Sequence, residues 1–180
     1  MLVYHGTENS FTVFDYSRIG QHGSSEGKGF YFTDSKQIAL SYANNGYVLT
    51  VKFRGNKLLH YTDKVITIPE WKRYLRKLHK VTDCLNNYDD VHRYGVERVL
   101  SKAIETEYKY STNDVDMVCS ICNGCGDTEN GLKMLYEVLG YDSVQVEADW
   151  GRQRLYIALT NDIIEIVNVE SADKARREAA

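Results

Sequence analysis

A run of nine residues around two glycines constrains this chain more than any other part of the sequence. It reads Gly27-Lys28-Gly29-Phe30-Tyr31-Phe32-Thr33-Asp34-Ser35. Glycines let a backbone approach a neighbouring group closely, and the aromatic triplet favours a strand. Alternation along that strand points Tyr31 to one face of a sheet and its two Phe neighbours to the other. The run therefore predicts either a slot for a flat ring beside open backbone or a glycine turn that enters an ordinary core strand.

A helix is expected directly after this strand. Asp34 or Ser35 can cap its first turn, and the helical period brings Ile38, Ala39 and Tyr42 near one another. Tyr42 then either forms a second wall of the slot or belongs to the core. The preceding segment, Glu8–Glu26, is irregular in pattern, and we expect it to form a loop over the slot.

Composition limits the class of protein. The chain has 180 residues, of which 43% are hydrophobic and 26% are charged, and this fits one globular domain with a core. The net charge of −3 argues against direct binding of nucleic acid. No secretory or membrane-spanning run is visible, and four cysteines in a chain of this length do not indicate a disulfide framework. These features favour the reducing cytoplasm as the compartment.

Strand patterns gather at both ends of the sequence. Short strands are expected at Leu2–Tyr4 and Leu58–Tyr61, and Tyr47–Phe53 alternates as a half-buried strand does. At the other end, three further strand patterns cover Asp142–Ala148, Leu155–Leu159 and Ile163–Val169. The charged tail, residues 173–180, is expected to fray.

Helical patterns occupy the middle of the chain, over residues 62–140. Pro69 suits the first turn of an amphipathic helix with Trp71, Leu75 and Leu78 inside and a basic outer side. A second helix is expected over about 90–107, and a third over Leu132–Leu139 with Gly140 as its stop. The sequence therefore predicts a single α+β domain over residues 1–180, with a helical insertion at 62–140.

Two ordered motifs give the chain a family resemblance. A strand ending in His5-Gly6-Thr7, followed by the Gly27–Phe32 run, resembles the ADP-ribosyltransferases of the poly(ADP-ribose) polymerase type, whose triad is His, Tyr and an acid. Tyr42 stands where that family has a second tyrosine. The resemblance implies the split β-sandwich of these enzymes, with NAD⁺ as the substrate that donates ADP-ribose and with no metal.

The C-terminal half resembles a narrower group. Val96–Ala103, the run Leu139-Gly140-Tyr141-Asp142-Ser143-Val144 and an acidic turn ending at Gly151 are similar to small phage ADP-ribosyltransferases, one of which is an anti-CRISPR protein. This resemblance implies mono-ADP-ribosylation of a macromolecular acceptor in a host cytoplasm. The expected acceptor is a protein side chain, and a host nucleoprotein complex is one candidate.

The resemblance also assigns roles to residues. His5 would hold a ribose hydroxyl, the Gly6 backbone the carboxamide of nicotinamide, and Tyr31 and Tyr42 would stack on the two sides of the ring. The remaining positions expected to contact NAD⁺ are Thr7, Gly29, Phe32 and Ser35.

The sequence departs from the polymerase pattern at two places. Those enzymes carry Glu at the start of the strand that corresponds to Leu155–Leu159, where this chain has Gln153, Arg154 and Leu155 and no acid. The small phage enzymes instead use an Asp from the end of the preceding strand, so Asp149, and after it Glu147, is our candidate for the catalytic acid. At Ala39 the polymerases have a Ser, for which Ser35 or Ser41 is a possible substitute.

Alternatives remain open. NAD⁺ could be hydrolysed or used to modify nucleic acid, as in a toxin, or the missing acid could mark a module that only binds a nucleotide or a partner. Cys119, Cys122 and Cys125 have the spacing of half a zinc knuckle, with Cys84 or His79 as a fourth ligand, but we expect thiols without metal. The basic helix side could also dock an acidic protein or a nucleic acid rather than only face solvent.

Overall fold

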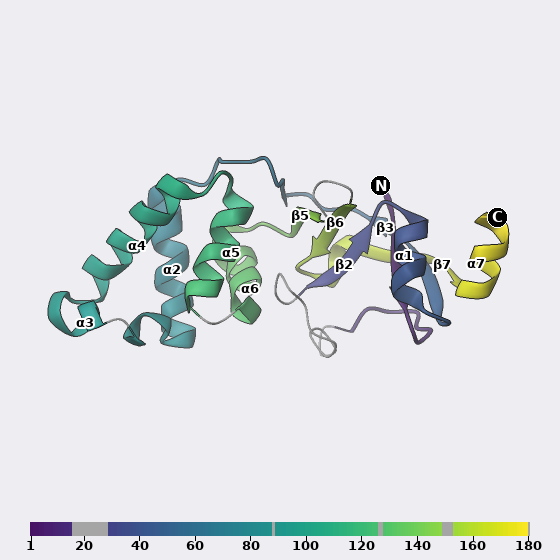
Figure 1. Ribbon diagram of the computed structural model, residues 1–180, viewed down its shortest axis with the longest axis horizontal. Helices are drawn as coiled ribbons and strands as arrows, with labels where there is room; N and C mark the ends of the chain where they lie inside the picture. Colours follow the sequence, from purple (N-terminus) through teal and green to yellow (C-terminus); the bar gives the residue numbers. More distant parts are fainter. Residues whose placement is uncertain (16–28, 88, 126–127, 149–152, 180) are drawn as a thin grey trace. The chain divides into compact units, whose positions relative to one another are not determined.

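A computed structural model gives the structure of the protein and describes residues 1–15, 29–87, 89–125, 128–148 and 153–179 (Figure 1). The chain divides into two compact units. The sheet unit comprises Met1–Ile19, Gly29–Leu58 and Asp142–Ala180, and the helical unit comprises Gly20–Lys28 and Leu59–Tyr141. The single domain with an insertion at 62–140 that the sequence suggested stays a prediction.

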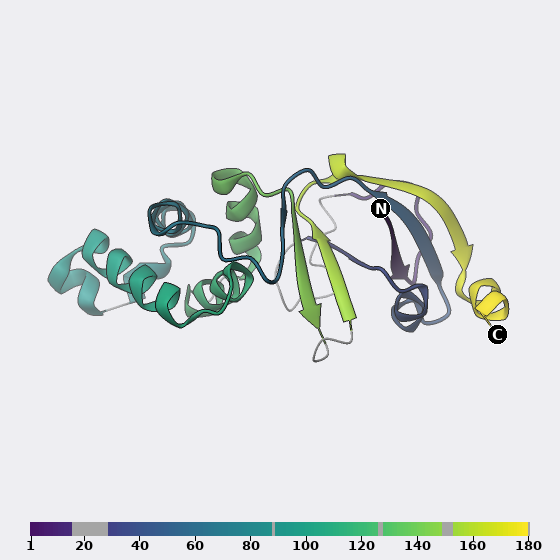
Figure 2. The same ribbon diagram turned by 90° about the horizontal axis from the view of Figure 1, so that it is seen from above.

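The strands form a seven-stranded sheet in the order β4-β5-β6-β2-β1-β3-β7, in which the neighbours from β5 to β7 pair antiparallel. The strands are β1 (Leu2–Thr7), β2 (Phe30–Thr33), β3 (Tyr47–Phe53), β4 (Leu58–Leu59), β5 (Ser143–Ala148), β6 (Gln153–Ala158) and β7 (Ile164–Ser171). Strands from both ends of the chain therefore complete one sheet, as the sequence predicted. The adjacent strands β5 and β6 are seen from above in Figure 2.

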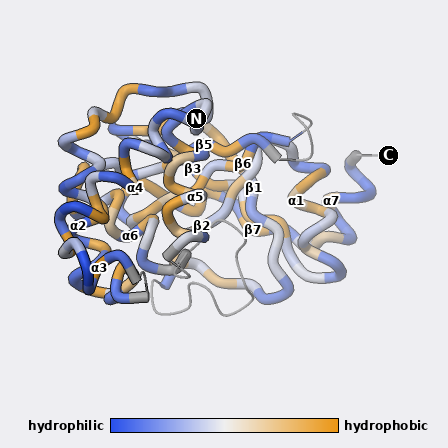
Figure 3. The backbone as a smooth tube through the Cα atoms, turned by 60° about the vertical axis from the view of Figure 1, so that its left-hand side comes forward, coloured by the Kyte–Doolittle hydropathy of each residue, from blue (hydrophilic) through white to orange (hydrophobic). Residues whose placement is uncertain are grey.

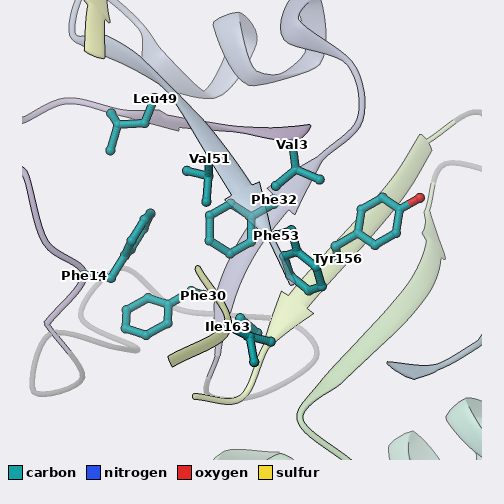
Figure 4. Packing of buried hydrophobic residues seen from close by; sticks show 10 residues of the cluster. Val3, Phe14, Phe30, Phe32, Leu49, Val51, Phe53, Tyr156 and Ile163 are labelled. Atoms are coloured by element: carbon teal, nitrogen blue, oxygen red, sulfur yellow. The ribbon is translucent and has the colours of Figure 1, made fainter. Parts of the chain in front are cut away.

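One face of the sheet carries an aromatic cluster (Figure 4). Its buried members are Val3, Phe14, Phe30, Phe32, Leu49, Val51, Phe53, Tyr156, Ala158 and Ile163. The expected alternation is confirmed: Phe30 and Phe32 lie in this cluster, whereas Tyr31 between them is half-buried. Edge-on ring pairs hold the cluster together, for example Phe14 with Phe32 at a centroid separation of 5.3 Å.

Helices α1 (Lys36–Ala43) and α7 (Ala172–Ala179) pack on the opposite face. Small residues make this contact close, with Ala39, Ala43 and Ala172 almost fully buried and Tyr4 packed beside them. The sequence predicted that β3 is half-buried, but Val48 on its second face is also buried because α1 and α7 cover it.

The C-terminal segment differs from the frayed tail that the sequence suggested. Residues 173–179 continue the helix α7 that starts at Ala172, and its side toward the sheet buries Ala172 and Ala175. On the same face, Glu170 is 8% exposed and lies 2.7 Å from the ammonium group of Lys36. The tail carries many charges, but two alanines at helical spacing are enough to dock it.

The helical unit contains α2 (Ile68–Thr82), α3 (Asp89–Tyr94), α4 (Val96–Tyr110), α5 (Asp114–Cys125) and α6 (Thr128–Leu139), with a short 3₁₀ helix, Cys84–Asn87, after α2. Pro69 lies in the first turn of α2 as predicted, and Glu70 accepts the Thr67 N–H at 2.9 Å. Trp71, Leu75 and Leu78 are buried as predicted.

Two helix boundaries depend on glycines with positive φ. Gly140 ends α6 with φ +74°, as the sequence predicted. The helix expected over about 90–107 is instead two helices, because Gly95 adopts φ +79° and separates α3 from α4. Residues Asp114–Cys125, for which the sequence pattern gave no helix, form α5.

A buried carboxylate joins the start of α5 to the segment that leads into α2. Asp114 is 1% exposed and accepts the backbone N–H groups of Val65 at 2.6 Å and Ile66 at 2.9 Å. Burial raises the pKa of Asp114, and these two hydrogen bonds oppose the shift. No helix in the described part of the chain is long and apolar enough to cross a membrane.

Candidate active site

The sheet opens between β1 and β2. Over the described residues, β1 pairs with β3 along its whole length and β2 pairs with β6 along its whole length. Between β1 and β2 themselves, only the pair Tyr4 and Thr33 is in register. Beyond that pair the two strands fork, and the fork lies next to His5, Gly6 and Tyr31. The fork corresponds to the split expected of the sandwich.

The His5 side chain bridges the two arms of this fork. Its Nδ1 lies 2.8 Å from the carbonyl oxygen of Tyr31. Phe11, Phe14 and Phe32 surround the ring, with centroid separations of 6.1, 5.4 and 5.8 Å. The histidine is therefore held both by a hydrogen bond across the fork and by packing against three phenyl rings.

This environment determines the charge and the tautomer of His5. Burial lowers its pKa from the ordinary value of 6.5, and the hydrogen bond to Tyr31 opposes the shift only in part. The ring is thus neutral at pH 7. A carbonyl oxygen can only accept, so Nδ1 carries the proton and Nε2 has a lone pair. Among the described residues Nε2 has no hydrogen-bond partner, so it can accept a hydrogen bond from a ligand hydroxyl.

Gly6 lies directly under α1. A Cβ at this position would lie 2.8 Å from the amide nitrogen of Ala43 and closer still to the carbonyl oxygen of Ala39. Only glycine allows the helix to approach β1 this closely. The same contact buries Ala39, where the polymerases have a Ser. The two proposed substitutes make local bonds: Ser35 accepts the Ile38 N–H at 3.3 Å as the helix cap, and the Ser41 hydroxyl donates to the Ile38 carbonyl at 2.7 Å.

Tyr31 and α1 lie on the same side of the sheet. Tyr31 points away from the aromatic cluster, and α1 packs on the face opposite that cluster. Tyr42 of α1 is 57% exposed, so it is not a core residue. Helical geometry places Tyr42 on a different flank of α1 from Leu40, which packs with the α7 residues. Tyr31 is half-buried on this side of the sheet, and the stacking of the two tyrosines on one ring stays a prediction.

The glycine before β2 has a neighbour inside the protein. Gly29 is buried, and the Ile157 side chain occupies the space that a Cβ would need. The contact with Ile157 by itself accounts for a glycine at this position. The contact between Gly29 and NAD⁺ therefore stays a prediction. Gly27 and Lys28 lie outside the described residues. Thr7 bonds locally to Asn9, with its hydroxyl 3.2 Å from the Asn9 carbonyl, and Phe32 is a member of the aromatic cluster.

Of the two candidate acids, the structure describes Glu147 but not Asp149. Glu147 is exposed at the end of β5, paired in register with Arg154. Two residues earlier on the same face, Gln145 bonds to the Tyr156 hydroxyl at 2.9 Å, which places this face on the side of the aromatic cluster. Glu147 therefore projects on the side of the sheet opposite Tyr31, which is the side on which His5 packs against Phe14 and Phe32. Asp149 lies outside the described residues, and its role stays a prediction.

Sequence reasoning missed Phe11 and Phe14 in the segment expected to be an irregular loop. Phe14 is 5% exposed and touches His5, Phe30 and Phe32. The only signal in the sequence was the short apolar run Phe11-Thr12-Val13-Phe14 inside a mostly polar stretch. Residues 16–26 of the segment expected to form a loop lie outside the described residues.

The cysteines are partly described. Cys84 and Cys122 are buried, and Cys122 Sγ lies 3.7 Å from the Tyr74 hydroxyl inside the helical unit. Among the residues that the structure describes, no group of three or more His, Cys, Asp or Glu residues could hold a metal ion. The side chain of Cys125 is not among them, so the absence of zinc stays a prediction.

Comparisons with known proteins identify the family of the chain. No protein with curated annotation matches the chain. A solved structure, the crystal structure of an anti-CRISPR protein, is similar at 18% sequence identity with a TM-score of 0.43, covering 93% of this chain and 95% of that one. Residues 1–171 match the family described as ADP-ribosyltransferase in polyvalent proteins. This match confirms the resemblance noted in the sequence, and the chain belongs to that family of ADP-ribosyltransferases.

Proposed function

We propose that this protein is a mono-ADP-ribosyltransferase that transfers ADP-ribose from NAD⁺ to a side chain of another protein. The observation that carries the proposal is the fork between β1 and β2, where a neutral His5 bonds to Tyr31 and offers Nε2 to a ligand. Family membership supports the reaction class. The motif resemblance to small phage enzymes supports a role as a phage or mobile-element effector, such as an anti-CRISPR protein, in a host cytoplasm.

The fork suits nicotinamide adenine dinucleotide for chemical reasons. The nicotinamide ring is cationic in NAD⁺, so it is attracted to the faces of tyrosines such as Tyr31 and Tyr42. His5 Nε2 accepts a hydrogen bond from a ribose hydroxyl. The bond between ribose C1′ and the nicotinamide nitrogen then breaks, its electron pair neutralises the departing ring, and an acceptor side chain attacks C1′ and loses a proton.

Rate enhancement needs an anion near the sugar. The attraction between tyrosine and the ring weakens as the ring becomes neutral, so stacking positions the substrate but does not stabilise the transition state. A carboxylate beside the oxocarbenium-like ribose does stabilise it. We assign this role to Asp149 before Glu147, because the small phage enzymes that the sequence resembles take their acid from this turn.

Labelling with biotinylated NAD⁺ tests the proposal. The purified protein, incubated with cell lysate and this donor, is expected to label one or a few discrete protein bands. Tyr31→Ala and Asp149→Ala should each reduce labelling by at least tenfold. Tyr110→Ala is the matched control, because Tyr110 is 72% exposed in the helical unit and should leave labelling unchanged. Free ADP-ribose without any labelled protein would indicate hydrolysis instead and would overturn the proposed acceptor.

A binding module without turnover is the second candidate. It is favoured by one observation: β6 begins Gln153-Arg154-Leu155 without an acid. A module of this kind would be stabilised thermally by NAD⁺ but would consume none of it. Measured NAD⁺ consumption that depends on Asp149 would exclude this candidate.

A further inference from the structure

The outer side of α2 carries three exposed cations. Arg73, Lys77 and Lys80 are exposed and recur at helical spacing, so they form one stripe. None of the three forms an ion pair with a described residue. Their neighbours on α2 are already neutralised: Arg76 Nε lies 2.7 Å from Glu97, and Lys72 lies 3.0 Å from Glu105.

These two ion pairs place α4 beside α2 and set its direction. Lys72 meets Glu105 and Arg76 meets Glu97, so the two helices run antiparallel (Figure 1). The Lys80 end of α2 is therefore level with the start of α4. The exposed sides of the two helices form one continuous surface, which we name the α2–α4 face.

A shallow depression of about 300 Å³ lies between α3 and α4, and Arg98 in its lining follows Glu97, the partner of Arg76 on α2. It is lined by Asp90, Tyr94, Arg98, Val99 and Lys102. The ring of Tyr94 is 43% exposed, and guanidinium groups lie over it from Arg98 at 4.8 Å and Arg93 at 5.4 Å. Most residues of α3 are hydrophilic, as the blue colour of this helix in Figure 3 shows. The depression is thus an exposed aromatic ring flanked by planar cations, at the small end of ligand-site volumes.

This combination selects among possible partners. Planar guanidinium groups and aromatic rings both stack on nucleobases, and a line of cations follows a phosphate backbone. An acidic protein surface could form ion pairs with the cations, but it has no nucleobase to stack on Tyr94. The net charge of −3 argued against nucleic acid, but net charge is an average over the chain, and here the cations gather on one face. We propose that the α2–α4 face binds single-stranded nucleic acid, with a base stacked at Tyr94 and Arg98 and phosphates on Arg73, Lys77 and Lys80.

Fluorescence anisotropy with a fluorescein-labelled U15 RNA tests this directly. The full chain is expected to bind it at 50 mM NaCl, and log K should fall with log salt with a slope of about −0.7 for each phosphate contacted. The triple variant Arg73→Glu, Lys77→Glu, Lys80→Glu should weaken binding by at least tenfold and flatten the slope. Tyr94→Ala should weaken binding roughly tenfold by loss of stacking, with the slope unchanged.

A charge-matched triple variant in the sheet unit is the control. Lys52, Lys174 and Arg177 are exposed there, and changing all three to Glu alters net charge equally but should leave RNA binding unchanged. Equal losses in both triple variants, or no binding at 50 mM NaCl, would overturn the proposal. So would equal affinity for a 15-residue polyglutamate peptide. The assay contains no NAD⁺, so its result is independent of the proposed transferase activity.

Discussion

At the scale of single residues, His5 decides what the fork can bind. A protonated imidazole has two donors, and only the neutral ring with Nδ1–H bonded to Tyr31 leaves Nε2 as an acceptor. The phenyl rings around it keep it neutral by excluding water. The aromatic cluster therefore does more than fill the sheet face, because it also sets the protonation state of a residue that would contact substrate.

This environment predicts a specific dependence of stability on pH. The folded-state pKa of His5 lies below 6.5, so the unfolded chain binds the proton more readily in the window between the two values. The free energy of unfolding should fall as pH drops from about 6.5 through the lowered pKa. Urea unfolding at pH 5.5 and 7.5 measures this, and His5→Gln should show a smaller loss at pH 5.5 than the natural sequence. Identical losses in both proteins would show that His5 is not buried as described.

Gly6 supplies a second prediction for a single residue. Gly6→Ala introduces a methyl group that clashes with the backbone of α1, so the helix must move away from β1. We expect a loss of about 1–3 kcal/mol, which corresponds to roughly 3–10 °C in melting temperature for a chain of this length. Differential scanning calorimetry measures it. Ser41→Ala on the exposed side of α1 is the control, and an equal melting temperature for Gly6→Ala would contradict the close contact.

At the scale of elements, the sequence predicted those features of helices and strands that depend on a local pattern of residues. The alternation through Phe30–Phe32, the proline at the start of α2 and the glycine after α6 all follow from a few neighbouring residues, and the structure has them. The break at Gly95 was missed because a glycine inside a helical pattern costs only about 1 kcal/mol relative to alanine, so the pattern continues across it. The close packing of α1 and α7 depends on small residues that carry little signal in sequence.

The fork itself was expected only through the family resemblance. Whether two strands pair along their length or diverge depends on how the side chains around them pack, here the rings of Phe11 and Phe14 and the imidazole that bridges the gap. The strand patterns of β1 and β2 do not show this packing, although Phe11 and Phe14 follow β1 closely in sequence. The role of Gly6 under α1 was likewise missed, since the sequence suggested only a ligand contact for it.

Asp114 gives a prediction at the scale of elements. Its carboxylate satisfies two backbone N–H groups in the segment before α2, and Asp114→Ala would leave them without acceptors. An unsatisfied buried donor costs about 1–3 kcal/mol, so we expect a clear loss in the urea midpoint. Asp114→Asn keeps one acceptor oxygen and should lose less. Asp116→Ala, also in the first turn of α5 but exposed, is the control. A loss no larger than in that control would contradict the role given to Asp114.

At the scale of the whole molecule, the two units have separate chemistry. The sheet unit holds the fork and the tyrosines, and the helical unit holds the basic surface and the exposed Tyr94. A transferase needs both a site for the donor and a means of choosing the acceptor, and acceptor choice often depends on surfaces added to a shared fold. The division of residues between the units is consistent with such a separation of tasks.

The central claim is that NAD⁺ binds at the fork with its nicotinamide ring on Tyr31. Isothermal titration calorimetry of NAD⁺ against the purified full chain tests it most directly, with Tyr31→Ala and Tyr110→Ala as the matched pair. We expect the natural sequence and Tyr110→Ala to bind with equal Kd, and Tyr31→Ala to bind at least tenfold more weakly because the ring stack is lost. Equal affinity in all three proteins would contradict the claim.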